Sequence, residues 1–308
     1  MAIKLGIHTG PQDLTFEELR RLWQRADEAG FHWISVWDHF YANPLNRRED
    51  PCFEAVASMA ALAALTRNVR VGCLMFCSWF RPPGVLAKAA VTIDHVSGGR
   101  ANLGIGGGWF EEEFREFGYG FPPIGERLDH LEETLQVVRS LLREPSTTFK
   151  GKYHHLENAV CGPKPMNPKL KLWVGGRGPK RTPAIAARYA DGFNTPYIAP
   201  DQFARRMSAI DQACERIGRD PGEVERSVNL GFYTGVDRKS ADAKRAALES
   251  SGHAIAKGSL VGLTAEAIDR IGEYERAGAQ GLNIAFRPPV DWDAFEAFIE
   301  EVLPVYNR

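Results

Sequence analysis

The sequence has few cysteines, no long apolar run and almost no net charge, and each shortage excludes a class of protein. Five of its 308 residues are cysteine, and no second Cys or His pair joins Cys73 and Cys77 to give zinc-ligand spacing. The 38 Lys and Arg residues balance 39 Asp and Glu residues, so nothing attracts nucleic acid or an anionic membrane. No apolar run is long enough to cross a membrane, and the start, MAIKLGIHTG, lacks the apolar stretch of a signal peptide. We therefore expect a cytoplasmic protein with free thiols and no metal, nucleic-acid or membrane partner.

Short apolar runs typical of buried strands alternate with helical patterns along the chain. Eight such strands are predicted, each followed by a helix, at residues 3–7, 34–40, 69–76, 101–105, 170–174, 192–195, 227–234 and 281–286. Parallel strands that alternate with helices at this length predict an α/β fold, the (β/α)8 TIM barrel. A doubly wound sheet is the alternative. No linker or composition shift marks a second domain, so we expect a single barrel domain over residues 1–308.

One stretch interrupts this alternation between the fourth and fifth predicted strands. Lys150-Gly151-Lys152 lies between two extended pieces within residues 146–156. A glycine-containing turn between extended segments is typical of a β-hairpin. We therefore predict a hairpin inserted into the barrel rather than a core element.

The second predicted strand ends in two titratable residues, Asp38 and His39. In barrels, ligands sit at the carboxyl ends of the strands. His titrates near neutral pH, and an acid beside it can hold its orientation and tautomer. Proton chemistry with Asp38 as the partner of His39 is one interpretation. A pair that caps the following turn is the other.

Glycine-rich segments follow the fourth and fifth strands. Gly106, Gly107 and Gly108 precede Trp109, which stands where a dinucleotide-binding G-x-G-x-x-G sequence would need glycine, so Rossmann-type binding is rejected. The sequence GGRGPKR at residues 175–181 combines glycines after a strand with cations at a helix start, a pattern that favours phosphate. A flexible turn and a solvated basic surface are the respective alternatives.

Three consecutive acids, Glu111, Glu112 and Glu113, open the helical piece that follows Trp109. They could form a catalytic carboxylate cluster. Acids in a first helical turn also complement the helix dipole, and solvated acids at such a position are common. We therefore expect these three side chains to be solvated.

Several stretches together resemble the bacterial luciferase-like family, and in particular its branch of oxidoreductases that use coenzyme F420, a 5-deazaflavin. The resemblance covers nearly the whole chain. The resemblance is found in four stretches: ADEAGFHWISVWDHF, RPPGVLAKAAVTIDHVSGGRANLGIGGGWFEEEFREFG, GKYHHLENAVCGPKP and LWVGGRGPKRTPAIAARYADGFN. The family fold is a (β/α)8 barrel with an insertion, as the strand count also predicts.

The resemblance implies a role for particular positions. Asp38 and His39 would lie against the deazaflavin ring, with His39 as the acid/base. A non-proline cis peptide behind the ring maps to Leu74 and Met75. The glycines Gly106, Gly107 and Gly108 would line the cofactor, and its phosphate tail would meet Gly175, Gly176 and Arg177.

One departure bears on the substrate. Sugar-phosphate dehydrogenases of this family place a catalytic Glu directly after the glycines of the fourth strand, where this chain has Trp109. The resemblance therefore implies a different, apolar or aromatic small-molecule substrate, which would meet Phe40, Trp79 and Trp109. The resemblance also implies a homodimer and possible partnership with a reductase that recycles the cofactor.

The sequence leaves three other interpretations of the function. An FMN-dependent monooxygenase supplied with reduced flavin by a partner reductase would use similar barrel ends. A non-catalytic flavin- or deazaflavin-binding protein would make Asp38 and His39 structural. Metal-dependent hydrolysis is a weakly supported interpretation, because no convincing further metal-ligating residue joins His8, Asp38 and His39.

Overall fold

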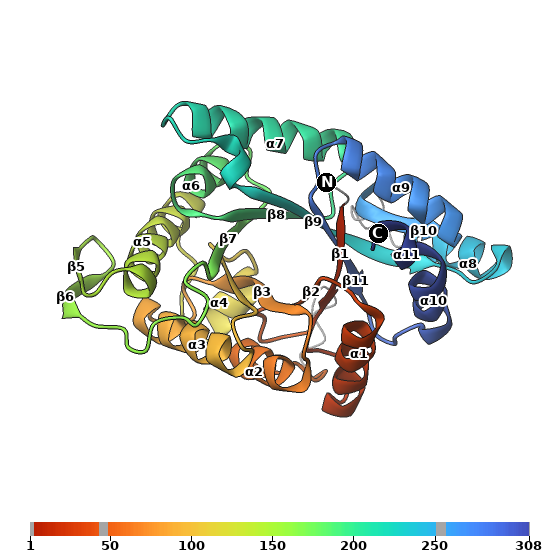
Figure 1. The fold of residues 1–308 in the computed structure, drawn as a ribbon, viewed down its shortest axis with the longest axis horizontal. Coiled ribbons are helices and arrows are strands. Elements are labelled where there is room, and N and C mark those ends of the chain that lie inside the picture. Colours follow the sequence, from red (N-terminus) through yellow and green to blue (C-terminus); the bar gives the residue numbers. More distant parts are fainter. Residues whose placement is uncertain (1–2, 43–48, 251–256, 308) are drawn as a thin grey trace.

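Eight parallel strands close into a barrel in the computed structural model, which describes residues 3–42, 49–250 and 257–307 (Figure 1). Neighbours around the barrel follow the order β1, β2, β3, β4, β7, β8, β9, β11, and β11 pairs with β1 to close the circle. The strands are β1 (Lys4–Thr9), β2 (Trp33–Val36), β3 (Arg70–Cys77), β4 (Ala101–Gly106), β7 (Lys171–Gly175), β8 (Gly192–Pro196), β9 (Glu225–Thr234) and β11 (Gly281–Phe286). The predicted TIM barrel is confirmed.

Helices form a ring around this barrel (Figure 1). In chain order they are α1 (Phe16–Ala29), α2 (Ala55–Leu65), α3 (Pro83–Val96), α5 (Ile124–Arg143), α6 (Arg181–Tyr189), α7 (Pro200–Glu215), α8 (Arg238–Ser250), α9 (Thr264–Arg276) and α10 (Trp292–Ala297). Helix α10 continues through a π-helical turn, η3 (Phe298–Val302), into α11 (Leu303–Tyr306), and a 3-10 turn, η1 (Pro221–Glu223), precedes β9. The short α4 (Glu111–Glu116) follows β4.

The hairpin predicted between the fourth and fifth barrel strands is also confirmed. Strands β5 (Thr147–Lys150) and β6 (His155–Ala159) pair antiparallel and form a separate two-stranded sheet. Their turn is attached to α5, because the Glu133 carboxylate accepts hydrogen bonds from the backbone N–H groups of Lys152 (2.7 Å) and Tyr153 (2.8 Å). The insertion is therefore fixed to α5.

The structure differs from the prediction at the end of β2 and by one additional strand. Strand β2 ends at Val36, so residues 37–40 leave the sheet before the Asp-His pair. A ninth strand in the same sheet, β10 (Ser259–Gly262), pairs with β9 outside the closed barrel and is not among the eight predicted strands. Four residues are too few to show a clear alternation of apolar and polar positions.

The apolar core lies mainly between the strands and the helices, while much of the barrel interior is polar. The Asn229 side-chain oxygen accepts hydrogen bonds from Asn194 and Asn283, both at 3.0 Å. The indoles of Trp33 and Trp173 pack together with ring centroids 4.7 Å apart. These interior layers support the strand ends that carry the site. In the described ranges, no helix combines the length and apolarity needed to cross a membrane.

Candidate functional site at the carboxyl ends of the strands

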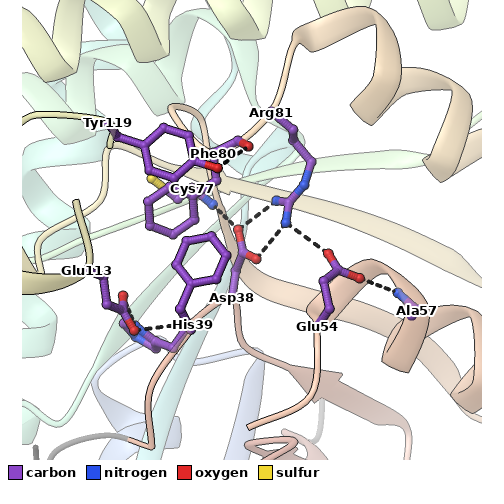
Figure 2. Close-up of polar contacts among 10 residues, drawn as sticks. Asp38, His39, Glu54, Ala57, Cys77, Phe80, Arg81, Glu113 and Tyr119 are labelled. Atoms are coloured by element: carbon purple, nitrogen blue, oxygen red, sulfur yellow. Dashed lines mark hydrogen bonds and ion pairs between the residues drawn. The ribbon is translucent and has the colours of Figure 1, made fainter. Parts of the chain in front are cut away.

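Asp38 lies just beyond β2, where it pairs with Arg81 and braces the end of β3 (Figure 2). Arg81 donates two hydrogen bonds to the carboxylate, at 2.7 and 2.8 Å, and the backbone N–H of Cys77 donates a third at 2.8 Å. Arg81 also contacts Glu54, whose carboxylate caps the first turn of α2 at Ala57. Asp38 thus joins the ends of two strands and, through Arg81, the start of a helix.

The Arg81 guanidinium is itself largely buried. Burial acts to lower the pKa of Arg81, but its hydrogen bonds and charge interaction with Asp38 outweigh burial and raise that pKa above its usual value. A bidentate pair of this kind has strict geometry as well as attraction. Asp38 is consequently a structural anchor of the barrel mouth.

His39 has a different acidic partner. Its Nδ1 lies 2.8 Å from Oε2 of Glu113, which reaches it from α4 and is 1% exposed (Figure 2). The second oxygen, Oε1, accepts hydrogen bonds from the backbone N–H groups of Phe40 (2.8 Å) and Tyr41 (3.0 Å). The indole of Trp109 contacts the imidazole edge to face, with ring centroids 5.6 Å apart.

These contacts correct two expectations. The acid bonded to the His39 ring is Glu113, and both oxygens of Asp38 are engaged by Arg81, so Asp38 is not the partner of His39. Of the acidic run, Glu111 is exposed as expected, Glu112 is half-buried and Glu113 is buried. A helix with 3.6 residues per turn placed against the β2 loop can present one acid of three inward.

Behind these residues, β3 carries the irregularity that the resemblance implied. The Leu74–Met75 peptide bond is cis, and the pairing of β3 with β4 shifts register between Cys73 and Phe76. The Met75 side chain fills space beside two neighbouring glycines. A Cβ at Gly104 would approach its sulfur to 2.6 Å, and a Cβ at Gly175 would approach its terminal methyl to 2.5 Å.

The three glycines after β4 differ in their burial and in the space around them. Gly106 is buried beside Met75, and Gly107 is only partly covered. Gly108 has φ +72°, and a Cβ there would collide with the Phe114 ring at 2.4 Å. At Gly108 the fold itself requires glycine, and the predicted contact of these glycines with a cofactor stays a prediction.

The loop after β7 is basic, and a residue from α7 supports it. Arg177 donates to the carbonyl oxygens of Pro196 (3.3 Å) and Tyr197 (3.2 Å), and the first turn of α6 has no side-chain cap. Arg206 donates to the Gly178 carbonyl at 2.8 Å, and its buried Nε has no hydrogen-bond partner within residues 3–42, 49–250 and 257–307. Burial lowers the pKa of Arg206, and no carboxylate in the described ranges pairs with it.

The three aromatic residues predicted for a substrate pocket are not in one cluster. Phe40 stacks on Phe117 with centroids 4.2 Å apart, and Trp79 stacks on His130 with centroids 4.1 Å apart. Only Trp109, which is 62% exposed, contacts His39. The structure therefore brings Trp109 to His39, whereas Phe40 and Trp79 both pack against the apolar cluster of Cys77, Phe80 and Phe114.

His8, at the end of β1, completes this side of the mouth. Its Nδ1 lies 2.9 Å from the Ser35 hydroxyl, and its ring packs edge to face against Trp37. Burial, with the positive charge of Arg287 and the proximity of His39, lowers the pKa of His8 to about 3. His8 is therefore a neutral neighbour of His39 at physiological pH.

Sequence reasoning found Asp38 and His39 but missed Arg81, Glu113 and Arg206. In the described ranges, no group of three or more His, Cys, Asp or Glu side chains could hold a metal ion. The site consists instead of a half-buried histidine paired with a buried glutamate, a braced strand end and a cationic, glycine-rich loop. Such a set can hold and move a proton beside a ligand whose anionic part lies on the loop.

A parallel eight-stranded barrel with these strand ends defines the class of fold, and comparison with known proteins gives the family. The family of luciferase-like monooxygenases matches residues 2–285, so the chain belongs to that family. The F420-dependent glucose-6-phosphate dehydrogenase of Amycolatopsis mediterranei is 27% identical over 246 residues, which are 78% of this chain and 72% of that protein.

Two further comparisons cover different extents. The pyrimidine monooxygenase RutA of Escherichia coli is 32% identical over 182 residues, or 56% of this chain, and the chain spans about half the length of that protein (48%). A solved F420-dependent secondary alcohol dehydrogenase, in complex with an F420–acetone adduct, superimposes over the full length of both chains with a TM-score of 0.88 and 21% identity. That structure establishes the shared fold.

Proposed function

We propose that this protein is an oxidoreductase that uses coenzyme F420 to transfer a hydride to or from a small organic substrate. The relative named for F420 dependence aligns over 78% of this chain, whereas the match to the pyrimidine monooxygenase is confined to 56%. The observation that carries the proposal is the pairing of His39 with Glu113 at the mouth of the barrel, on the same rim as a loop suited to an anion. The single domain, homodimer and cytoplasmic location expected from the sequence stay predictions.

The loop after β7 fits the phosphodiester of such a cofactor. The uncapped start of α6 presents backbone N–H groups, and a helix dipole favours an anion there. Arg206 adds a partly buried positive charge with no carboxylate partner among the described residues. Because burying an unpaired guanidinium is costly, a phosphate beside Gly175, Gly176 and Arg177 would complete this region.

The ring would lie towards β3 and the Asp-His segment. When bound, the deazaflavin supplies or accepts a hydride, which is a proton together with two electrons. Reduction of a carbonyl also needs a proton on its oxygen, and oxidation of an alcohol releases that proton. We assign the holding and transfer of this proton to His39, with Asp38 fixing the strand end on which His39 sits.

The substrate side differs from that of a sugar-phosphate dehydrogenase. The position directly after the glycines of β4 is Trp109, whose exposed indole adjoins His39. An indole offers apolar contact and one N–H donor, and no carboxylate. We propose that Trp109 contacts an apolar or aromatic substrate, while Phe40 and Trp79 act through the packing of the surrounding loops.

A fluorescence titration with F420 and with FMN tests the cofactor. We expect F420 to bind at least about tenfold more tightly, since the match that names F420 covers more of the chain. Tighter binding of FMN, together with oxygen consumption coupled to substrate oxidation, would instead identify an FMN-dependent monooxygenase. The partial match to the pyrimidine monooxygenase makes that the second candidate.

The role of His39 gives the first mutational prediction. In His39→Ala, we expect F420 affinity to stay within a few-fold while turnover falls by about 100-fold or more, because general acid–base catalysis contributes that much. The rate can be followed through F420 absorbance with 2-propanol, chosen because a neighbour in fold binds an F420–acetone adduct. An unchanged rate with any substrate that is turned over would remove His39 from the mechanism.

A further inference from the structure

We propose that Glu113 is a positioning residue for the reaction proposed above, and that it acts by fixing the tautomer and orientation of the His39 imidazole. The inference rests on the proposed function for its catalytic meaning. Its structural basis is the contact between Glu113 Oε2 and His39 Nδ1, at 2.8 Å, between residues 74 positions apart in the sequence.

The Glu113 side chain has little freedom to move. It is 1% exposed, and its other oxygen accepts two hydrogen bonds from the backbone of Phe40 and Tyr41, the residues that directly follow His39. The carboxylate therefore holds both the histidine ring and the chain segment that carries it (Figure 2). A group fixed at three points can orient its partner within a narrow range.

The chemistry of a carboxylate determines which proton His39 keeps. An ionised carboxylate only accepts hydrogen bonds, so the Nδ1 that faces it must carry the hydrogen. In neutral His39 the second nitrogen, Nε2, is then the acceptor, and a proton exchanged with a bound molecule passes through Nε2. Glu113 thereby assigns one nitrogen to structure and the other to chemistry.

The charged groups around the ring fit this assignment. Glu113 faces His39 from α4, whereas His8, which faces it from β1, stays neutral because its pKa is lowered to about 3. The adjacent carboxylate of Asp38 is matched by Arg81. The rings of Trp109 and Phe110 lie against the imidazole edge to face, which limits the approach of water from that side.

A purely structural role is the alternative, in which Glu113 only ties α4 to the loop after β2 through the two backbone N–H groups. Substitution by glutamine separates the two roles. The glutamine oxygen can still accept from Phe40 and Tyr41, and its NH2 group then takes the place of Oε2 and faces His39 Nδ1. Since that NH2 group only donates, Nδ1 must become the acceptor, and the neutral ring must move its hydrogen to Nε2.

The experiment measures the tautomer directly by 15N NMR of histidine-labelled protein at a pH where the ring is neutral, with the His39 signals assigned by their loss in His39→Ala. We expect the Nδ1–H form in the natural protein, the Nε2–H form in Glu113→Gln, and no change in Glu111→Gln, an exposed acid of the same helical turn. An Nε2–H form in the natural protein would overturn the proposal without any variant. So would an unchanged tautomer in a folded Glu113→Gln protein.

Activity gives the second readout. We expect Glu113→Gln to reduce kcat by about 100-fold or more, as expected when a catalytic histidine is held in the wrong tautomer, with F420 affinity within about threefold. Equal kcat in both proteins would leave Glu113 a structural residue. The NMR measurement needs neither cofactor nor turnover, so a protein that shows the tautomer change but binds no F420 would contradict the proposed function and not the Glu113–His39 pairing.

Discussion

At the ends of β2 and β3 the buried charges are matched within the chain, whereas Arg206 of α7, beside the loop before α6, has no carboxylate partner among the described residues. Asp38 meets Arg81 in a bidentate pair, and Glu113 meets His39 and two backbone N–H groups. Arg206 donates to the Gly178 carbonyl of the glycine loop, and its buried Nε has no hydrogen-bond partner among the described residues. Both regions bury charge, but Arg206 lacks a counter-charge in the part of the chain that the structure describes.

This difference separates what folding completes from what a ligand completes. A buried ion pair whose geometry is satisfied is strongly destabilised when one member is removed, because the other is left uncompensated. A partly buried cation without a carboxylate already has that cost in the free protein, and a bound anion relieves it. The same type of substitution should therefore have opposite consequences in the two regions.

The largest effect is expected from Arg81→Met, which leaves the Asp38 carboxylate buried without its cation. We expect the free energy of unfolding to fall by about 3–5 kcal/mol, as for other broken buried pairs. Urea unfolding measures the change. Arg115→Met is the matched control, because its pair with Glu111 is exposed and should contribute less than about 1 kcal/mol. Equal losses in both variants would show that the Asp38–Arg81 pair has no special importance.

The next effect concerns pH and the neutral His8 beside this region. The pKa of His8 is about 3 in the folded protein, against a reference value of 6.5. Because the folded value is the lower one, the unfolded chain binds the proton first as the pH falls, and stability is lost from about pH 6.5 downwards. From pH 7.5 to 4.5 this amounts to about 2.5 kcal/mol.

His8→Asn checks that sign. Asn cannot titrate in this range, so the stability of the variant should fall less steeply between pH 7.5 and 4.5 than that of the natural protein. Urea unfolding at several pH values gives both slopes. Parallel slopes would mean that His8 takes up a proton in the folded state as readily as in the unfolded chain.

The barrel could be predicted from the sequence because each of its strands is a short apolar run bounded by turn residues. Strand β10 was missed, since its four residues show no alternation and its place beside β9 is set by the tertiary fold. The cis peptide at Leu74–Met75 came only from the resemblance to a family. Local pattern thus accounts for the fold better than for its irregular parts.

The sequence predicted the site residues at the strand ends, but it did not predict the side chains that pair with them. Asp38 and His39 follow a strand and could be located by counting, but their partners lie 43 and 74 residues further along the chain. Nothing in a run of three acids distinguishes Glu113 from Glu112 before the helix is placed against the β2 loop. Arg206 likewise resembles its exposed neighbour Arg205 until α7 is packed beside the Gly178 loop.

The smallest expected effect is also the one that most sharply tests the contrast between the two regions. In Arg206→Met we expect F420 affinity to fall by about tenfold, or about 1.4 kcal/mol, because a charge-assisted contact to the phosphate is lost. The free energy of unfolding without ligand should stay the same or rise, since an unmatched buried charge is removed.

Arg205→Met serves as the control for this last substitution. Arg205 lies on the same helix, exposed and paired with Asp201, so its loss should change neither affinity nor stability measurably. Titration with F420 and urea unfolding of the same three proteins give both quantities. Destabilisation in Arg206→Met comparable to that in Arg81→Met would mean that the chain itself satisfies Arg206. In that case the α6 loop would be a structural counterpart of the Asp38 region and not the part of the mouth that an anion completes.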